Sequence, residues 1–153
     1  MIDKIKYQIL FWFSFVVVFI FDQWFKYLIL NGLRYQSEYL DLTFALNTGV
    51  AFSMFSFLEH YLKYIHLIVI IILFIYLFNQ KIFLKKHLIA FGMILGAGSS
   101  NLFDRFVHGG VVDMFFWHKW FEFAIFNIAD VMINLGVFLI LIQEIFIKKE
   151  GRK

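Results

Sequence analysis

Four long apolar segments, separated by shorter polar ones, dominate the pattern of the chain. Each is close to the ~20 residues that a helix needs to cross a bilayer. The pattern therefore predicts an all-α membrane protein with four transmembrane helices. The predicted spans are about 8–30, 61–78, 88–106 and 127–147.

The polar segments between the spans predict less regular structure. Segment 31–60 contains turn signals at Asn31-Gly32 and at Asn47-Thr48-Gly49, and Tyr39–Leu46 alternates loosely between apolar and polar residues. Such alternation is typical of short strands, and we expect one or two at the membrane surface. We interpret 79–87 as a basic loop, and residues 1–153 as a single domain without repeats.

Composition and charge support a membrane location and indicate an orientation. The chain is 62% hydrophobic and only 16% charged, which is too apolar for a soluble domain. Its net charge of +3 does not indicate a nucleic-acid partner, because nine of the 14 Lys and Arg residues lie in the two tails and in 79–87. The positive-inside rule then places both termini and that loop in the cytoplasm, so that 31–60 and 107–126 are extracytoplasmic.

Four aspartates stand out in this apolar chain. Asp22, Asp104 and Asp130 lie within predicted spans, ~21 to 26 Å from the cytoplasmic edge of a core ~30 Å thick. Asp113 lies in the outer connection. Ionisable residues at such depth are costly and usually functional. We therefore expect the four carboxylates to gather near the outer interface.

The spacing of the polar residues groups them further. Asp22 and Lys26 are four residues apart, share a helix face and can form an ion pair, either to stiffen the helix or as part of a site. Two polar stripes on the later spans can face the bundle interior. Hydrogen bonding from helix to helix is the alternative role, and we expect it for Asn134 and Gln143 taken alone. The stripes are Asn101, Asp104 and Arg105, and Asn127, Asp130 and Asn134.

The residue inventory favours carboxylate chemistry. The five His residues lack the spacing of a metalloprotease, and with no Cys there is no thiol nucleophile. Ser99 or Ser100 could approach Lys26, but pairing with Asp22 would keep that amine protonated and unable to act as a base. A mechanism in which two carboxylates share a proton across a water molecule requires only groups that this chain contains. The spacing does not indicate which two of the four aspartates would form the pair.

A non-enzymatic role as an ion carrier or an assembly subunit is the alternative from another class. A carrier predicts polar residues through the cytoplasmic halves of the spans. Segments 9–21, 67–78 and 137–142 offer almost none.

Five short motifs, in order along nearly the whole chain, resemble the signal peptidase II family of bacterial aspartyl proteases. They are Asp22-Gln-x-x-Lys26, Asn47-Thr-Gly-Val-Ala-Phe52, Asn101-Leu-Phe-Asp104-Arg105, Gly110-Val-Val-Asp113 and Phe126-Asn127-Ile-Ala-Asp130.

The resemblance implies a fold and an activity. The family has four transmembrane helices with a small extracytoplasmic β cradle. It removes the signal peptide of prolipoproteins by cleaving before a Cys that carries diacylglycerol, and it needs no metal or other cofactor. We therefore expect a multi-pass protein of the bacterial cytoplasmic (inner) membrane whose partners are prolipoprotein substrates and membrane lipid, and which works as a monomer.

The resemblance also implies roles for single residues. Asp113 and Asp130 would form the catalytic pair, because they occupy the Val-Val-Asp and Asn-x-Ala-Asp positions. The other matching positions would bind substrate or support the site, and they are Asn47, Asn101, Arg105, Asn127, Asp22, Lys26 and Asp104. The chain departs from the family pattern at Ser100, where Gly is usual, and at Ala124, where Pro is common.

Overall fold

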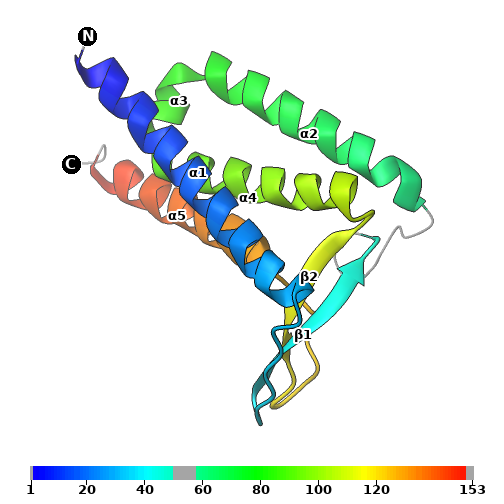
Figure 1. Cartoon of the computed structure of the whole chain (residues 1–153). Coiled ribbons are helices and arrows are strands. Elements are labelled where there is room, and N and C mark those ends of the chain that lie inside the picture. Colours follow the sequence, from blue (N-terminus) through cyan, green and yellow to red (C-terminus); the bar gives the residue numbers. More distant parts are fainter. Residues whose placement is uncertain (1, 50–57, 151–153) are drawn as a thin grey trace.

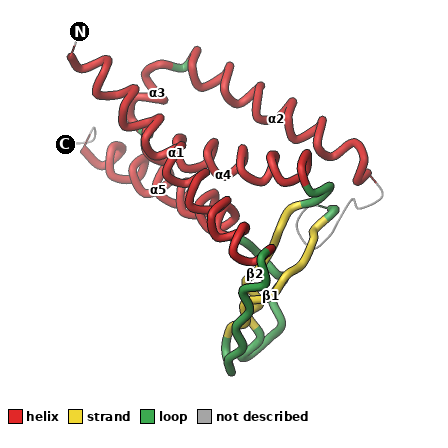
Figure 2. Tube along the Cα trace, in the orientation of Figure 1, coloured by secondary structure: helices red, strands yellow, loops and turns green. Residues whose placement is uncertain are grey.

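A computed structural model describes residues 2–49 and 58–150 of the chain. Residues 50–52 of the second motif and the tail 151–153 therefore lie outside the described residues. Helices make up most of the described chain, and a small sheet lies at one end (Figure 2). The elements are α1 (Ile2–Leu30), β1 (Leu40–Asn47), α2 (Glu59–Asn79), α3 (Lys81–Lys86), α4 (Leu88–Val107), β2 (Val111–Trp117) and α5 (Ile128–Glu150).

The long helices form a bundle around α4. Helix α4 contacts α1, α2 and α5, and it is the most buried of the four. Both termini and α3 lie at one end of the bundle, and the sheet lies at the other (Figure 1). This arrangement agrees with the prediction that the termini and the basic segment 79–87 share one side of the membrane.

Three helices of the described chain are long and apolar enough to cross a membrane. They are Tyr7–Leu30, His60–Asn79 and Ile128–Phe146, within α1, α2 and α5. Most of their large apolar side chains face outward, as expected for helices in lipid. The third predicted span is also a helix, α4, but it carries small and polar residues and does not belong to this set.

Glycines on α4 allow the helices to approach closely, as the run of small residues predicts. A Cβ added at Gly96 would clash with the carbonyl oxygen of Phe15 in α1, and one at Gly92 would lie 2.5 Å from that of Phe11. On another face, a Cβ at Gly98 would lie 2.8 Å from Ile70 in α2. Backbone-to-backbone packing therefore joins α1 to α4.

The sheet consists of β1 and β2 paired antiparallel. The alternation of Tyr39–Leu46 correctly predicted β1, whereas β2 fell in a segment interpreted only as a connection. Ala45 pairs with Asp113 and Asn47 with Val111. Because side chains alternate between the faces of a strand, Asn47 lies on the same face as Asp113.

The prediction of a loop over 79–87 was wrong, because residues Lys81–Lys86 form the short helix α3. The segment has no Gly or Pro to stop a helix, and Lys and Leu favour one. It ends at His87, whose ring is buried against Phe83 and Phe91.

Replacing Gly96 with Ala tests the contact between α1 and α4. The added methyl would meet the backbone of Phe15, which cannot rotate away, so we expect a loss of about 1–3 kcal/mol in the free energy of unfolding. Unfolding in mixed detergent micelles measures it. Ser99→Ala on the same helix adds no atom and is the control. Equal stability of the two variants would contradict the packing.

Candidate active site

A single ammonium group joins two carboxylates beneath the sheet. Lys26 Nζ in α1 lies 2.6 Å from Asp22 Oδ2 and 2.7 Å from Asp104 Oδ2, and it donates to Asn101 Oδ1 at 2.8 Å. The side chain of Lys26 is 1% exposed, and those of both aspartates are 0% exposed. All three ammonium protons therefore have acceptors in a buried site. We call Lys26, Asp22, Asp104 and Asn101 the Lys26 cluster.

Each carboxylate of the Lys26 cluster also holds a backbone segment of the neighbouring element. Asp22 Oδ1 accepts the N–H of Ala129 at the start of α5, at 2.8 Å. Asp104 Oδ2 accepts the N–H of Val112 in β2, at 3.1 Å. These two residues immediately precede the two carboxylates that line the cavity. The Lys26 cluster therefore ties together the two elements that carry them.

Asn127 connects these two carboxylates, Asp113 and Asp130. The Asn127 amide Nδ2 donates to Asp113 Oδ1 at 2.6 Å. Its Oδ1 accepts the backbone N–H of Asp130 at 2.9 Å, and Asp130 Oδ2 accepts the N–H of Asn127 at 3.1 Å. This reciprocal pair is a capping box in which an Asp takes the usual place of Glu.

The capping box corrects one prediction. Asn127 was expected to share a helix face with Asp130 and Asn134, but it precedes α5 and caps it. The amide is therefore free of the helix surface and reaches the sheet. Asn134 donates to the Asp130 carbonyl of its own helix, so the helix-to-helix bond expected for it was wrong. Gln143 contacts His87, the residue between α3 and α4, at 2.6 Å, and so joins α5 to the residue that precedes α4.

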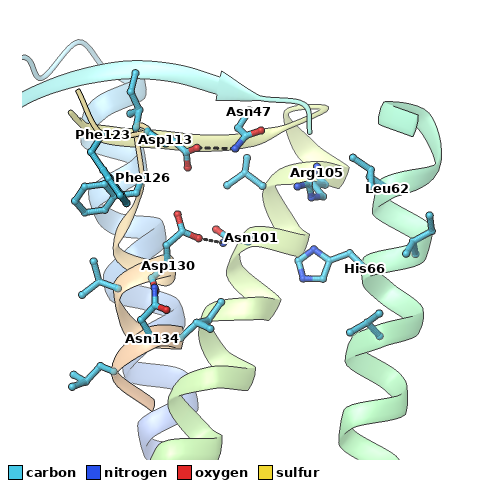
Figure 3. Close-up of a pocket in the computed structure, with 18 of the residues that line it drawn as sticks. Asn47, Leu62, His66, Asn101, Arg105, Asp113, Phe123, Phe126, Asp130 and Asn134 are labelled. Atoms are coloured by element: carbon cyan, nitrogen blue, oxygen red, sulfur yellow. Dashed lines mark hydrogen bonds between the residues drawn. The ribbon is translucent and has the colours of Figure 1, made fainter. Parts of the chain in front are cut away.

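Two further amides bind the remaining carboxylate oxygens of Asp113 and Asp130. Asn101 Nδ2 donates to Asp130 Oδ1 at 3.1 Å, and Asn47 Nδ2 donates to Asp113 Oδ2 at 3.1 Å (Figure 3). Asn101 Oδ1 also accepts from Asn127 Nδ2 at 3.2 Å. A continuous network of hydrogen bonds thus runs from Lys26 to both carboxylates.

The two carboxylates lie at the polar end of a cavity of about 910 Å³. This volume is in the range of small-molecule and cofactor sites. Apolar side chains form most of the remaining wall. The polar residues of the lining are Asn47, His66, Asn101, Arg105, Asp113, Asp130 and Asn134, and the apolar ones include Leu62, Ile65, Val69, Phe123, Phe126, Val131, Leu135 and Phe138.

Arg105 supplies the positive charge beside the cavity. Its side chain in α4 is 8% exposed and interacts electrostatically with the carboxylates of Asp104, Asp113 and Asp130. Its Nη2 donates to the carbonyl of Gly49, just after β1. Arg105 therefore joins α4 to the chain that leaves the sheet.

Burial, followed by the negative charge of Asp130, raises the pKa of Asp113 from its ordinary value to about 6. The amides of Asn47 and Asn127 and the charge of Lys26 act in the opposite direction. A carboxyl whose pKa is raised in this way can hold a proton close to neutral pH. Paired carboxyls with shifted pKa values are typical of acid and base catalysis.

Comparison with known proteins identifies the family. The family model described as signal peptidase (SPase) II matches residues 14–146. The chain belongs to the signal peptidase II family. A lipoprotein signal peptidase of Campylobacter jejuni (serotype O:6) is 71% identical over 150 residues, covering 98% of this chain and 96% of that protein. A lipoprotein signal peptidase of Helicobacter acinonychis is 52% identical, covering 91% and 88%.

A solved structure supports the fold of the peptidase. A bacterial membrane enzyme determined by the in meso method at 2.3 Å resolution has a TM-score of 0.73 with this chain and is 28% identical to it. The match covers 92% of this chain and 90% of that one.

The peptidase brings its predicted site residues together in two groups. Asn47, Asn101, Arg105, Asp113 and Asp130 line the cavity. The other four, Asp22, Lys26, Asp104 and Asn127, are buried beneath it. The functional roles assigned to these residues stay predictions.

The serine–lysine alternative does not fit the geometry. Ser100 Oγ donates to Asp22 Oδ2 at 2.6 Å and accepts from Gln23 Nε2 at 2.8 Å. Lys26 is bound to Asp22, as their spacing predicts, and also to Asp104. Its ammonium therefore has no free electron pair with which to activate a serine. The described residues also contain no group of three or more His, Asp or Glu side chains that could hold a metal ion.

His66 in α2 is a cavity residue that the sequence analysis did not assign to the site. There it was considered only as a metal ligand. An imidazole within a predicted span was the signal that could have drawn attention to it, although the sequence does not show which way the ring faces.

Replacing Lys26 with Met tests the energetic role of the Lys26 cluster. The change would leave two buried carboxylates without their counter-ion, so we expect the free energy of unfolding to fall by about 3–5 kcal/mol. Lys119→Met is the matched control, because Lys119 lies 3.8 Å from an exposed Glu38 and should contribute less than about 1 kcal/mol. Similar losses in both variants would contradict the structural role of Lys26.

Asp130→Asn should lower the pKa of Asp113. The substitution removes a negative charge that disfavours ionisation of Asp113, whereas burial stays, so the pKa should fall below about 6 without reaching its usual value. Carboxyl ¹³C NMR of Asp-labelled protein in micelles measures it, with the Asp113 signal identified by its loss in Asp113→Asn. Asp41→Asn, on the same sheet but outside the cavity, is the control. An unchanged or higher pKa of Asp113 in Asp130→Asn would show that the two carboxyls do not interact.

Proposed function

We propose that the chain is a lipoprotein signal peptidase of the aspartic type, which cleaves diacylglyceryl-modified prolipoproteins before the lipidated Cys. The observation that carries this proposal is the pair of Asp113 and Asp130, joined by Asn127 at the polar end of a largely apolar cavity. The relatives named lipoprotein signal peptidase support the substrate class.

The cavity suits a substrate with a lipid attached. Its apolar wall contains Val69, Leu135 and Phe138, which lie along α2 and α5 away from the carboxylates. A diacylglyceryl group can stay among these side chains or in lipid while the peptide bond next to it reaches the polar end. A soluble protease has no such access to a bond at this depth.

In the proposed reaction, a water molecule lies between Asp113 and Asp130. The ionised carboxylate takes a proton from the water, whose oxygen attacks the scissile carbonyl carbon. The protonated carboxyl donates a hydrogen bond to the carbonyl oxygen and then gives its proton to the leaving amine. The C–N bond breaks, and the products are a free carboxyl and a free amine.

The hydrogen bonds and charges around Asp113 and Asp130 support this mechanism. Like charges held close together do not ionise independently, so the pair shares one proton near the working pH. The raised pKa of Asp113 suits a pair that retains one proton near neutral pH. Amide donors from Asn47, Asn101 and Asn127 fix the oxygens in place, which orients the water without a catalytic metal.

We further propose that α4 completes a four-span bundle in the bacterial inner membrane, with both termini in the cytoplasm. The termini and α3 lie at the end of the bundle opposite to the sheet (Figure 1), which supports this orientation. The site then opens near the outer face, where signal peptides are removed after translocation. Arg105, Asn47 and Asn101 would contact the substrate, and Asp22, Lys26 and Asp104 would support the pair.

Asp113→Asn and Asp130→Asn should each lower kcat by about 100-fold or more, because each removes one partner of the proton transfer. Cleavage of a diacylglyceryl-modified prolipoprotein by the purified protein, in detergent with EDTA present, measures this. Wild-type cleavage should not change with EDTA.

The matched control is Asp41→Asn, which neutralises a carboxylate of β1 that lies outside the cavity beside His118. This variant should keep the wild-type rate. Measurable turnover by both Asp113→Asn and Asp130→Asn would exclude the pair as the catalytic groups.

A further inference from the structure

His66 places a polar ring on the apolar wall that α2 contributes to the cavity. Leu62, Ile65 and Val69, the neighbouring cavity residues of α2, are all apolar. Figure 3 shows the imidazole directed from α2 toward α4, close to Arg105. The ring lies next to α4, because a Cβ on Gly98 of that helix would be 4.0 Å from His66 Nε2, an ordinary van der Waals distance.

The ring has no hydrogen-bond partner within the part of the chain that the structure describes. The polar group that interacts with it is the guanidinium of Arg105, which, like an imidazole N–H, is a donor. His66 is half-buried and its imidazole carries at least one N–H in either protonation state, so a ligand that displaces water from the cavity must offer this donor an acceptor or leave it unpaired at a cost. The geometry therefore calls for an acceptor that enters the cavity from outside.

The charges around Arg105 indicate whether that acceptor is charged or neutral. A cation is disfavoured, because Arg105 is positive and adjacent. An anion is also disfavoured, because the carboxylates of Asp104, Asp113 and Asp130 all interact with Arg105 and already offset its charge. A neutral acceptor, such as a carbonyl oxygen of an amide or an ester, suits both donors best.

We propose that His66, together with Arg105, binds a carbonyl oxygen of the substrate and so helps to hold it along the α2 wall. The inference rests on the proposed function, since a diacylglyceryl prolipoprotein brings such oxygens into the cavity. They come from two sources, the peptide backbone and the two acyl esters. In both cases His66 is a binding residue that takes no part in proton transfer.

His66→Leu tests the proposal through the separate values of KM and kcat. Loss of one hydrogen bond to substrate should raise KM by about 3- to 10-fold and leave kcat within about twofold. His66→Gln, which keeps an N–H donor, should recover most of the loss. His60→Leu is the matched control, because it makes the same change at the exposed start of α2, outside the cavity.

A pair of substrates identifies the carbonyl. One carries ester-linked acyl chains, and the other carries ether-linked alkyl chains without the carbonyl oxygens. An effect of His66→Leu confined to the ester substrate assigns the contact to the lipid, and an equal effect on both assigns it to the peptide. Wild-type KM for both substrates in His66→Leu, or a KM that falls, would overturn the proposal.

Two further measurements distinguish a failure of this proposal from a failure of the proposed function. Absence of cleavage by well-folded wild type would contradict the proposed function itself, whereas normal cleavage by His66→Leu would contradict only the role of His66. The unfolding midpoint of each variant reports its fold. If His66→Leu does not fold, His66→Phe, which keeps a ring without N–H groups, replaces it.

Discussion

The buried ammonium of Lys26 is the interaction on which the rest of the site depends. A charge in an apolar bundle is tolerated only when every polar atom around it is paired, and Lys26 meets this condition through Asp22, Asp104 and Asn101. Because Asp22 and Asp104 also accept backbone N–H groups near the starts of α5 and β2, the same cluster holds those two ends in place. The positions of Asp113 and Asp130 follow from it.

Close packing elsewhere makes this geometry attainable. Without side chains at Gly92 and Gly96, the backbones of α1 and α4 approach closely enough for Lys26 of one helix to reach Asp104 and Asn101 of the other. The antiparallel register brings Asn47 to Asp113, and the capping box at Asn127 turns an amide from the end of α5 toward the sheet. Helix packing, strand pairing and helix capping therefore act together to position the carboxyl groups of Asp113 and Asp130.

Much of this could be predicted from the sequence, for physical reasons. Apolar runs of membrane length predicted the long helices, and the charges placed at costly depth predicted which residues would meet. Strand β2 was missed because its Val-Val-Asp segment was considered only as a connection, although a β-branched and aromatic run after Gly109-Gly110 is typical of a strand. The capping role of Asn127 depends on where α5 begins. The position of His66 in the cavity depends on which face of α2 meets α4. Neither follows from the sequence pattern alone.

The masses of the products that the purified protein forms from a diacylglyceryl-modified prolipoprotein, with EDTA and hydroxylamine present, test the central claim most directly. Direct attack by water held between Asp113 and Asp130 predicts a signal peptide that ends in a free carboxylic acid and a mature protein that begins with the lipidated Cys. A hydroxamate at the new carboxyl terminus would reveal a covalent acyl-enzyme and contradict the carboxylate pair. Absence of cleavage by well-folded protein would contradict the peptidase function.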